Sequence, residues 1–169
     1  VDQPTTVTVS TTDGTALVSD GDYTALSGHV LNFSANQTTA TFLVDSTVDS
    51  TVEDDETFTV ALGAVTGGYG DVTASGTSRT GTIGNDDTAE FTIRQDESGA
   101  EDGGAITFTV DLSNPVDQAT GVTVSTSDGT AFVADDDYTP LSDHEVEFPA
   151  GRQTWFFDVL MHSDNKVEQ

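Results

Sequence analysis

Residues 45–58 read DSTVDSTVEDDETF, and the rest of the sequence is organised around this stretch. Its first twelve residues hold six carboxylates and no Lys or Arg. The stretch lies between two runs with the composition of strands, 39–44 and 57–62. Carboxylates this close together repel one another unless a cation lies among them, and Ca²⁺ prefers oxygen ligands. The first hypothesis is therefore a calcium site on a loop between two strands.

The composition is that of an acidic all-β protein. Four Lys and Arg residues against 30 Asp and Glu residues give the 169-residue chain a net charge of −26. Nucleic acid and anionic membranes are unlikely partners, because both require clustered cations. The charge also opposes a compact fold by self-repulsion, which favours bound divalent cations. β-Branched and turn-forming residues are abundant, Cys is absent, and no run is apolar enough to span a bilayer, so we expect an extracellular protein without membrane insertion.

Alternating apolar and polar residues predict short strands joined by turns. The predicted strands cover residues 7–11, 29–33, 39–44, 57–62, 79–83, 90–94 and 105–112. A Gly-rich loop is expected over 63–76. Trp155, Phe156 and Phe157 are consecutive, so at least one of them should face solvent or an interface, because neighbouring side chains of a strand point to opposite faces.

From Val116 the sequence repeats its own beginning without a gap. The segment DGTA at 13–16 recurs at 128–131, which sets the offset at 128 − 13 = 115 residues, and Asp22-Tyr23 recurs as Asp137-Tyr138. A unit of this length is the size of a Greek-key sandwich domain. We therefore expect tandem units at 1–87 and 88–169.

Each unit lacks strands that the other contains. The first has no counterpart of 88–115, and the second has no counterpart of 55–87. One interpretation is that the sequence is a piece of a longer array. The other is that a neighbouring chain supplies the missing strands by β-strand addition.

The motifs and their order resemble Calx-beta repeats, the immunoglobulin-like β-sandwiches of sodium–calcium exchangers, integrin β4 and large bacterial surface proteins. The resemblance covers essentially the whole chain. It rests on DGTA at 13–16 and 128–131, the Asp-Tyr pairs, GHVLNF at 28–33, EDDETF at 53–58, TIGNDD at 82–87 and EDGG at 101–104. It implies an all-β fold of tandem immunoglobulin-like Greek-key sandwiches.

Calcium-binding members of this family gather Ca²⁺ ions at one end of the sandwich. By position, the resemblance implies ligands in the first unit at Asp22, Asp49, Thr51 (through its carbonyl), Glu53, Glu56, Asp86 and Asp87. In the second unit it implies Glu101, Asp137, Asp164 and Glu168. Two departures imply fewer ions or weaker binding: Val48 and Ser50 flank Asp49 where strong binders have consecutive aspartates, and Asn85 stands where Asp is common.

Alternatives for the same residues stay open. The acidic loop has the length of an EF-hand loop, but Ser50 stands where that loop requires Gly, and strands flank it instead of helices, so the choice is between a sandwich-end Ca²⁺ site and a solvated acidic loop. Tyr23 and Tyr138 should bury their rings and hydrogen-bond their hydroxyls. His29 and His144, at the same repeat position, are expected to be structural. No catalytic constellation is apparent, so we do not expect an enzyme.

The function expected from these features is structural. The chain would be a Ca²⁺-binding module of a large extracellular bacterial protein, used for spacing, stiffening, adhesion or filament assembly. Its partners would be neighbouring repeats of the same protein or same-chain copies, with a cell-surface or matrix ligand as a further possibility. The alternatives are a Ca²⁺-sensing regulatory module and a strand-exchanging fibre subunit.

Overall fold

The computed structural model describes residues 2–68, 70, 72–94, 97–99 and 104–163. Apart from one short 3-10 turn, η1 (Val133–Asp135), every element within these residues is a β-strand. The chain divides into two compact units, unit 1 (Val1–Asp49 and Asp54–Asn85) and unit 2 (Ser50–Glu53 and Asp86–Gln169). Within the described residues, no helix has the length and apolar character needed to cross a membrane.

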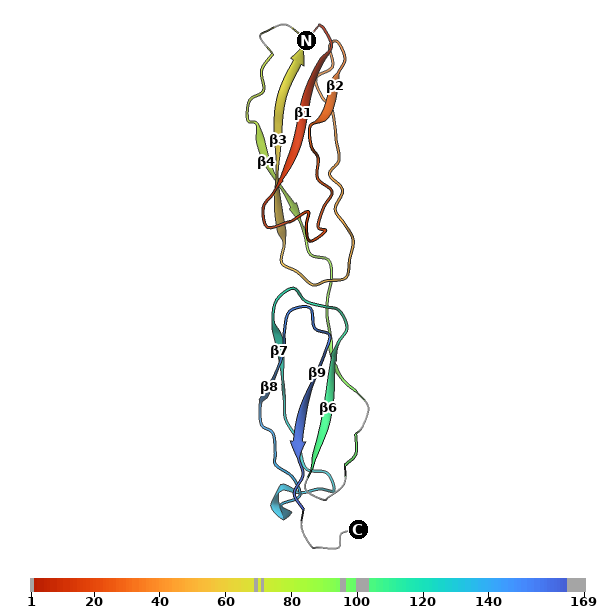
Figure 1. Ribbon diagram of the computed structural model, residues 1–169, viewed down its shortest axis with the longest axis vertical. Coiled ribbons are helices and arrows are strands. Elements are labelled where there is room, and N and C mark those ends of the chain that lie inside the picture. The colour runs from red at the N-terminus through yellow and green to blue at the C-terminus, as the bar shows by residue number, and fades with distance from the viewer. Residues whose placement is uncertain (1, 69, 71, 95–96, 100–103, 164–169) are drawn as a thin grey trace. The chain divides into compact units, whose positions relative to one another are not determined.

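Unit 1 is built on one antiparallel four-stranded sheet with the order β2-β1-β3-β4 (Figure 1). The strands are β1 (Thr5–Asp13), β2 (His29–Phe33), β3 (Glu56–Gly67) and β4 (Ser78–Ile83). Val7 and Val9 of β1 are buried and alternate with less buried Thr and Ser residues, so one face of the sheet supplies the core. The strands predicted at 7–11, 29–33, 57–62 and 79–83 are confirmed.

The Gly-rich loop expected over 63–76 is partly wrong, because β3 continues to Gly67. Its second half pairs with the beginning of β1, with Val65 opposite Val7. The register shifts between Val7 and Val9, which marks a bulge. A Cβ on Gly63 would lie only 2.5 Å from Thr8 Oγ1, so the glycine leaves room for the Thr8 side chain at this bulge.

The strand predicted at 39–44 is also wrong. These residues keep the alternation of half-buried and exposed side chains but are not assigned to a sheet. The chain after β2 is accordingly drawn as plain coil in Figure 1. The physical reason is that no described strand of unit 1 lies in hydrogen-bonding position along this segment, and a strand requires a partner.

Unit 2 contains two antiparallel groups of strands. One is a three-stranded sheet in the order β5-β6-β9, made of β5 (Phe91–Ile93), β6 (Ala105–Leu112) and β9 (Thr154–Leu160). The other is the pair β7 (Thr120–Val124) and β8 (His144–Phe148). The strands expected at 90–94 and 105–112 are confirmed as β5 and β6.

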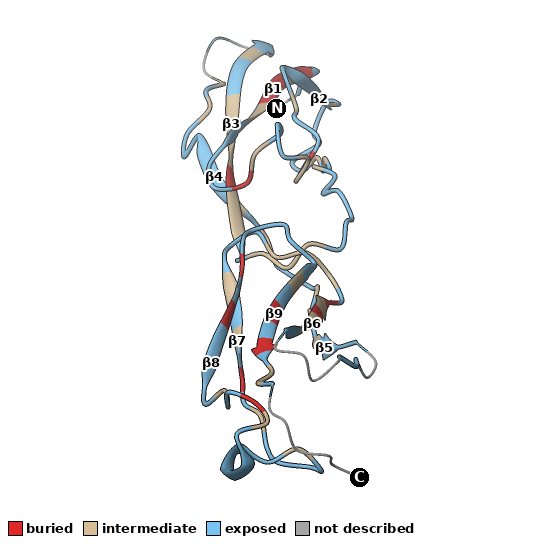
Figure 2. Ribbon diagram, turned by 60° about the horizontal axis from the view of Figure 1, so that its bottom comes forward, coloured by how far each residue is buried: buried red, intermediate tan, exposed pale blue. Residues whose placement is uncertain are grey.

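The core of unit 2 is one cluster between these two groups of strands. Its most deeply buried members are Phe148 and Val110, which are 0% and 1% exposed. Figure 2 shows the buried positions as isolated segments on strands whose remaining residues are largely exposed. The expectation for the aromatic triplet is confirmed, because Phe157 is buried whereas Phe156 is 61% exposed and stacks on Trp155.

Candidate metal centre

The Asp-Gly-Thr-Ala turn holds the tyrosine of each unit. Tyr23 is buried, and its hydroxyl donates to Asp13 Oδ1 at 2.6 Å. In unit 2 the buried Tyr138 donates to Asp128 Oδ1 at 2.8 Å. The expected burial and hydrogen bonding of both tyrosines are confirmed. Burial and the hydrogen bond to Asp13 raise the pKa of Tyr23, and the bond to Asp128 together with burial raises that of Tyr138.

The residue before each tyrosine closes the same turn from the other side. Leu17 N donates to Asp22 Oδ2 at 2.6 Å, and Phe132 N donates to Asp137 Oδ2 at 2.7 Å. One carboxylate oxygen of each Asp is therefore fixed by the backbone, and the carboxylate orientation is set before any ligand arrives.

Backbone hydrogen bonds tie the start of the acidic loop to this turn. Thr24 N donates to Asp45 O at 2.8 Å, and Thr47 N donates to Asp22 O at 2.9 Å. Unit 2 repeats this pattern, because Thr139 N donates to Leu160 O and His162 N donates to Asp137 O, both at 2.9 Å. These backbone hydrogen bonds therefore place the start of the acidic loop beside Asp22.

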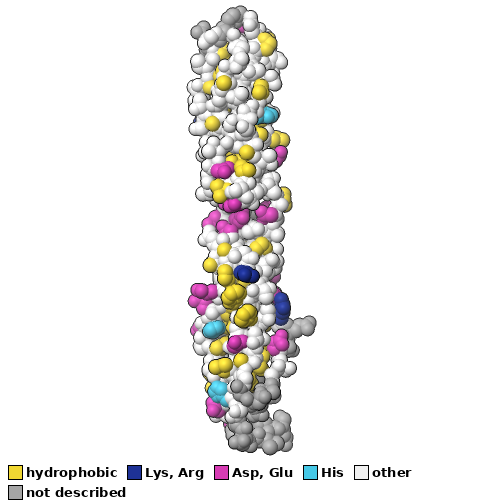
Figure 3. Space-filling view, viewed as in Figure 1, with side chains coloured by type: hydrophobic (Ala, Val, Ile, Leu, Met, Phe, Trp, Pro, Cys, Tyr) yellow, Lys and Arg dark blue, Asp and Glu magenta, His cyan; other side chains and the backbone are white. Residues whose placement is uncertain are grey.

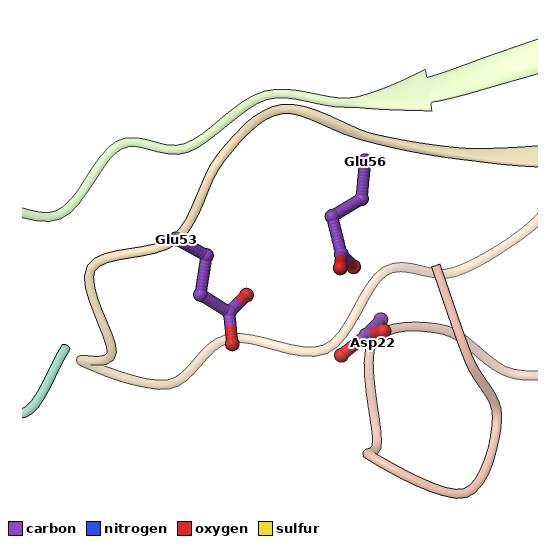
Figure 4. Close-up of side chains that lie close together, drawn as sticks. All are labelled: Asp22, Glu53 and Glu56. Carbon is purple, nitrogen blue, oxygen red and sulfur yellow. The ribbon is translucent and has the colours of Figure 1, made fainter. Parts of the chain in front are cut away.

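The loop then places two further carboxylates next to Asp22. Asp22, Glu53 and Glu56 each offer an oxygen, and these three oxygens lie within 4.8 Å of one another (Figure 4). All three residues are half-buried, and Glu56 is the first residue of β3. In Figure 4 the Glu56 side chain extends towards Asp22, and the Glu53 carboxylate lies on the same side of the loop.

The donor set fits a calcium ion. Ca²⁺ takes oxygen ligands at about 2.3–2.6 Å, so two ligand oxygens of one ion lie at most about 5 Å apart. The three carboxylate oxygens lie within 4.8 Å of one another, which satisfies that limit. Three carboxylates without sulfur or imidazole also favour a hard cation over zinc or copper. Asp22, Glu53 and Glu56 would hold such an ion, and backbone carbonyls and water would complete its shell.

The other predicted ligands are placed differently. Asp49, Asp86, Asp87 and Asp137 are described but lie outside this group of carboxylates. Thr51, which would contribute its backbone carbonyl, is also described. Glu101, Asp164 and Glu168 fall outside the described residues. Their roles as ligands stay predictions.

Sequence reasoning missed two contacts near the acidic loops. Asp55 Oδ1 accepts a hydrogen bond from Asn85 N at 3.0 Å, which ties the chain after β4 to the acidic loop. His162 Nδ1 lies 2.8 Å from Asp136 Oδ1, and its Nε2 lies 2.8 Å from Thr139 Oγ1. Neither contact has a signal in the sequence. Asp55 is one of several neighbouring acidic residues, and the first unit has Thr47 at the repeat position of His162, so the histidine contact is not repeated there.

The electrostatic surroundings of the carboxylate group are strongly negative. On the face drawn in Figure 3, acidic side chains predominate over basic ones. Arg94 forms a fork with Asp111, with N–O distances of 2.6 and 3.0 Å, and Arg79 donates to Ser78 O. These two arginines are thus engaged elsewhere, and in so anionic a chain a cation among the three carboxylates would relieve their repulsion.

Fold and site together define two antiparallel β-sheet units, the first of which contains an acidic loop that leads into a strand. The family model for the Calx-beta domain matches residues 1–97 and 84–169. The chain therefore belongs to the Calx-beta domain family, as its sequence motifs suggested.

Two solved structures are similar to the chain. One is the crystal structure of CBD12 from CALX1.2, with 22% identity, a TM-score of 0.45, and coverage of 98% of this chain and 65% of that one. The other is calcium binding domain CBD12 of CALX1.1, with 23% identity, a TM-score of 0.46, and coverage of 93% and 62%. The chain thus spans just under two thirds of each. Comparison with curated proteins gives no match.

Proposed function

We propose that this chain is a Ca²⁺-binding structural module of a large extracellular bacterial protein. Its repeats serve spacing, stiffening and attachment at the cell surface or in a matrix. Their partners are neighbouring repeats and a surface or matrix ligand. Ca²⁺ orders the acidic loop of each repeat, so the repeat is rigid only where the Ca²⁺ concentration is high.

The convergence of Asp22, Glu53 and Glu56 supports this proposal most directly. Residues separated by 31 positions in the sequence place oxygens within 4.8 Å, because the backbone pairs the loop with the tyrosine turn. Family membership supports the same cation, and the net charge of −26 explains why a structural domain would need it. In a chain without disulfides, an ion that binds only the folded state is an effective way to stabilise that state.

Calorimetric titration of the whole chain with Ca²⁺ tests the proposal. Binding should be saturable and should survive physiological salt, whereas Mg²⁺ should bind much more weakly because it requires a smaller and more rigid octahedral shell. The matched control is the double variant Glu53→Gln and Glu56→Gln, which keeps side-chain size and removes two charges. Wild-type heats that match those of the double variant would show that the loop is merely a solvated acidic segment.

A further inference from the structure

Unit 2 has a groove between the outer edges of β8 and β9. Among the described strands, β8 pairs only with β7, and β9 ends the order β5-β6-β9, so each has one edge without a neighbouring strand. The groove has a volume of about 630 Å³, which is in the range of ligand sites. Every residue of β8 lines it, together with the consecutive β9 residues Trp155, Phe156 and Phe157. Because neighbouring side chains of a strand point to opposite faces, a groove lined by consecutive residues follows the edge of the strand.

A strand of the β3 type would not cover this groove. In unit 1 the order is β2-β1-β3-β4, so β3 pairs with β1 on the edge away from β2. The counterpart of β2 in unit 2 is β8, because 29 + 115 = 144 and 33 + 115 = 148, and the counterpart of β1 begins at β7. A β3-type strand would therefore join β7 and leave β8 at the edge.

The groove lining combines aromatic rings with carboxylates. Trp155 and Phe156 stack with their ring centroids 5.7 Å apart and their planes at 18°, and Phe156 is 61% exposed. Glu145 and Glu147 of β8 also line the groove, and none of its described lining residues is Lys or Arg; Arg152, in the turn between β8 and β9, is not among them. An aromatic face attracts a cation, and carboxylates lining a cleft attract it from a longer distance. This lining is complementary to a positively charged group.

The core of the repeat does not require this lining, because unit 1 lacks it. The counterparts of Trp155, Phe156, Glu145 and Glu147 in unit 1 are Ala40, Thr41, Val30 and Asn32. The inward-facing residues of the same strands, in contrast, keep apolar counterparts: Val146, Phe148 and Phe157 correspond to Leu31, Phe33 and Phe42. The two units thus share these core positions and differ in the residues that give the groove its aromatic and acidic character.

The backbone of β9 offers hydrogen-bonding groups along the same edge. Leu112 N of β6 donates to Gln153 O at 2.7 Å. Bonded and non-bonded pairs alternate in an antiparallel ladder, so the odd-numbered residues of β9 bond to β6, and the N–H and C=O groups of Phe156 and Asp158 face the other edge. The alternation is borne out at the end of the strand, where Leu160 O accepts a loop amide at 2.9 Å.

We propose that this groove binds an extended, basic segment of another protein. The segment pairs with the free edge of β9 at Phe156 and Asp158, and one of its Arg or Lys side chains lies against the Trp155–Phe156 ring pair beside Glu147. Backbone pairing supplies affinity, and the aromatic and acidic lining selects the charge. The net charge of −26 disfavours a second copy of this chain as the occupant. The calcium site plays no part in this inference, so the two proposals can fail separately.

The single tryptophan of the chain lies in the groove and reports its occupancy. The probe is the end-capped peptide TVRVRVT, and its match carries citrulline, which has the shape of arginine without the charge, at both arginine positions. Titration of the full chain at constant Ca²⁺ and physiological salt should change Trp155 fluorescence saturably. The citrulline peptide should bind roughly five- to thirtyfold more weakly than the arginine peptide. Equal affinities, or no change in fluorescence, would overturn the proposal.

Three variants place the binding in the groove. Glu147→Gln and Glu90→Gln each remove one negative charge from unit 2, but Glu90 directly precedes β5, at the opposite edge of the β5-β6-β9 sheet. Only Glu147→Gln should weaken the arginine peptide, by roughly two- to fivefold, whereas non-specific attraction to an anionic chain would weaken equally in both. Phe156→Leu keeps an apolar side chain at an exposed position but removes the ring, so it should reduce the preference for arginine over citrulline. An unchanged preference would contradict the proposed cation site.

Amide exchange followed by NMR tests the strand pairing. With the arginine peptide bound, exchange should slow at Phe156 and Asp158 and stay nearly unchanged at Trp155 and Phe157, whose amides already bond to β6. Bound peptide without this alternation would show that no strand is added to β9. Protection at β8 in its place would likewise refute the assigned edge.

Discussion

Replacing Asp22 with Asn separates two roles of this side chain. Its Oδ2 accepts the Leu17 amide at 2.6 Å, and it belongs to the carboxylate group with Glu53 and Glu56. An amide oxygen can still accept the backbone N–H, but an amide carries no charge. Asp22→Asn should therefore preserve the turn and remove most of the calcium affinity.

The effect of this substitution on stability should change sign with Ca²⁺. The three oxygens lie within 4.8 Å of one another, and two unit charges at that largest separation repel by about 0.9 kcal/mol in the dielectric of bulk water. Neutralising Asp22 removes two of the three repulsions, which is about 1.7 kcal/mol before screening by salt. In EGTA the variant should thus be more stable than wild type. With Ca²⁺ at about 100 times its Kd, wild type should gain about 2.7 kcal/mol that the variant lacks.

Thermal unfolding can be followed by two probes. Trp155 is the single tryptophan and lies in unit 2, so its fluorescence reports that unit, whereas far-UV circular dichroism reports both. For a domain of this size, about 2.7 kcal/mol corresponds to roughly 10–20 °C in Tm. This shift should appear in the dichroism of wild type.

The matched control is Asp137→Asn. Asp137 makes the equivalent bond to Phe132 N in unit 2 but lies outside the group formed by Asp22, Glu53 and Glu56. Asp137→Asn should leave the calcium-dependent shift in Tm intact. An Asp22→Asn protein whose Tm rises with Ca²⁺ as much as that of wild type would refute the assignment.

Two further predictions concern stability alone. Gly81→Ala should destabilise unit 1 by about 1–3 kcal/mol, because the added methyl would lie 2.4 Å from the ring of Phe58. The control Gly129→Ala places its methyl in open space and should destabilise the protein much less. Urea unfolding of the two variants measures both effects. The raised pKa of Tyr23 means that the unfolded chain loses this proton first, so the stability it contributes is intact below about pH 10 and is lost as pH rises through the folded-state pKa. Absorbance titration of the phenolates should show late ionisation of Tyr23 and Tyr138, and Tyr23→Phe should remove part of the late fraction; a single ordinary transition for all tyrosines would contradict this.

Strands whose partners lie in the same unit could be predicted from the sequence. The limits of β2 and β6 match the expected ranges, because alternating side chains and flanking turn residues both mark their ends. The end of β3 could not be predicted in this way. Its glycines at 63 and 67 look like loop residues, and only the bulge opposite β1 explains why a strand passes through them.

The carboxylate group was predictable only through the repeat and the family resemblance. Spacing alone does not bring Asp22 to Glu53 and Glu56, because the approach depends on hydrogen bonds between the tyrosine turn and the loop. The role of Asp13 as acceptor for the tyrosine hydroxyl did have a signal in the sequence. In both units an Asp precedes the Tyr by ten residues, and both pairs form the same hydrogen bond.

The two units also show that a strand pattern and a strand are different things. Residues 39–44 and the matching part of β9 share position in the repeat and inward-facing alternation. Among the described residues, only β9 has a neighbouring strand, β6, and only β9 is itself a strand. The same rule explains why β1 spans nine residues and its counterpart β7 only five. β1 is paired on both edges, by β2 and β3, whereas β7 pairs with β8 alone.

The turns that follow β1 and β7 also depend on the backbone that lies beside them. Ala16 is fully buried, and its amide donates to Thr57 O of β3 at 2.9 Å, whereas its counterpart Ala131 is only half-buried and lies beside no described equivalent of β3. Alternation in the sequence therefore determines which face of a segment turns inward, and the neighbouring backbone determines whether that segment is a strand.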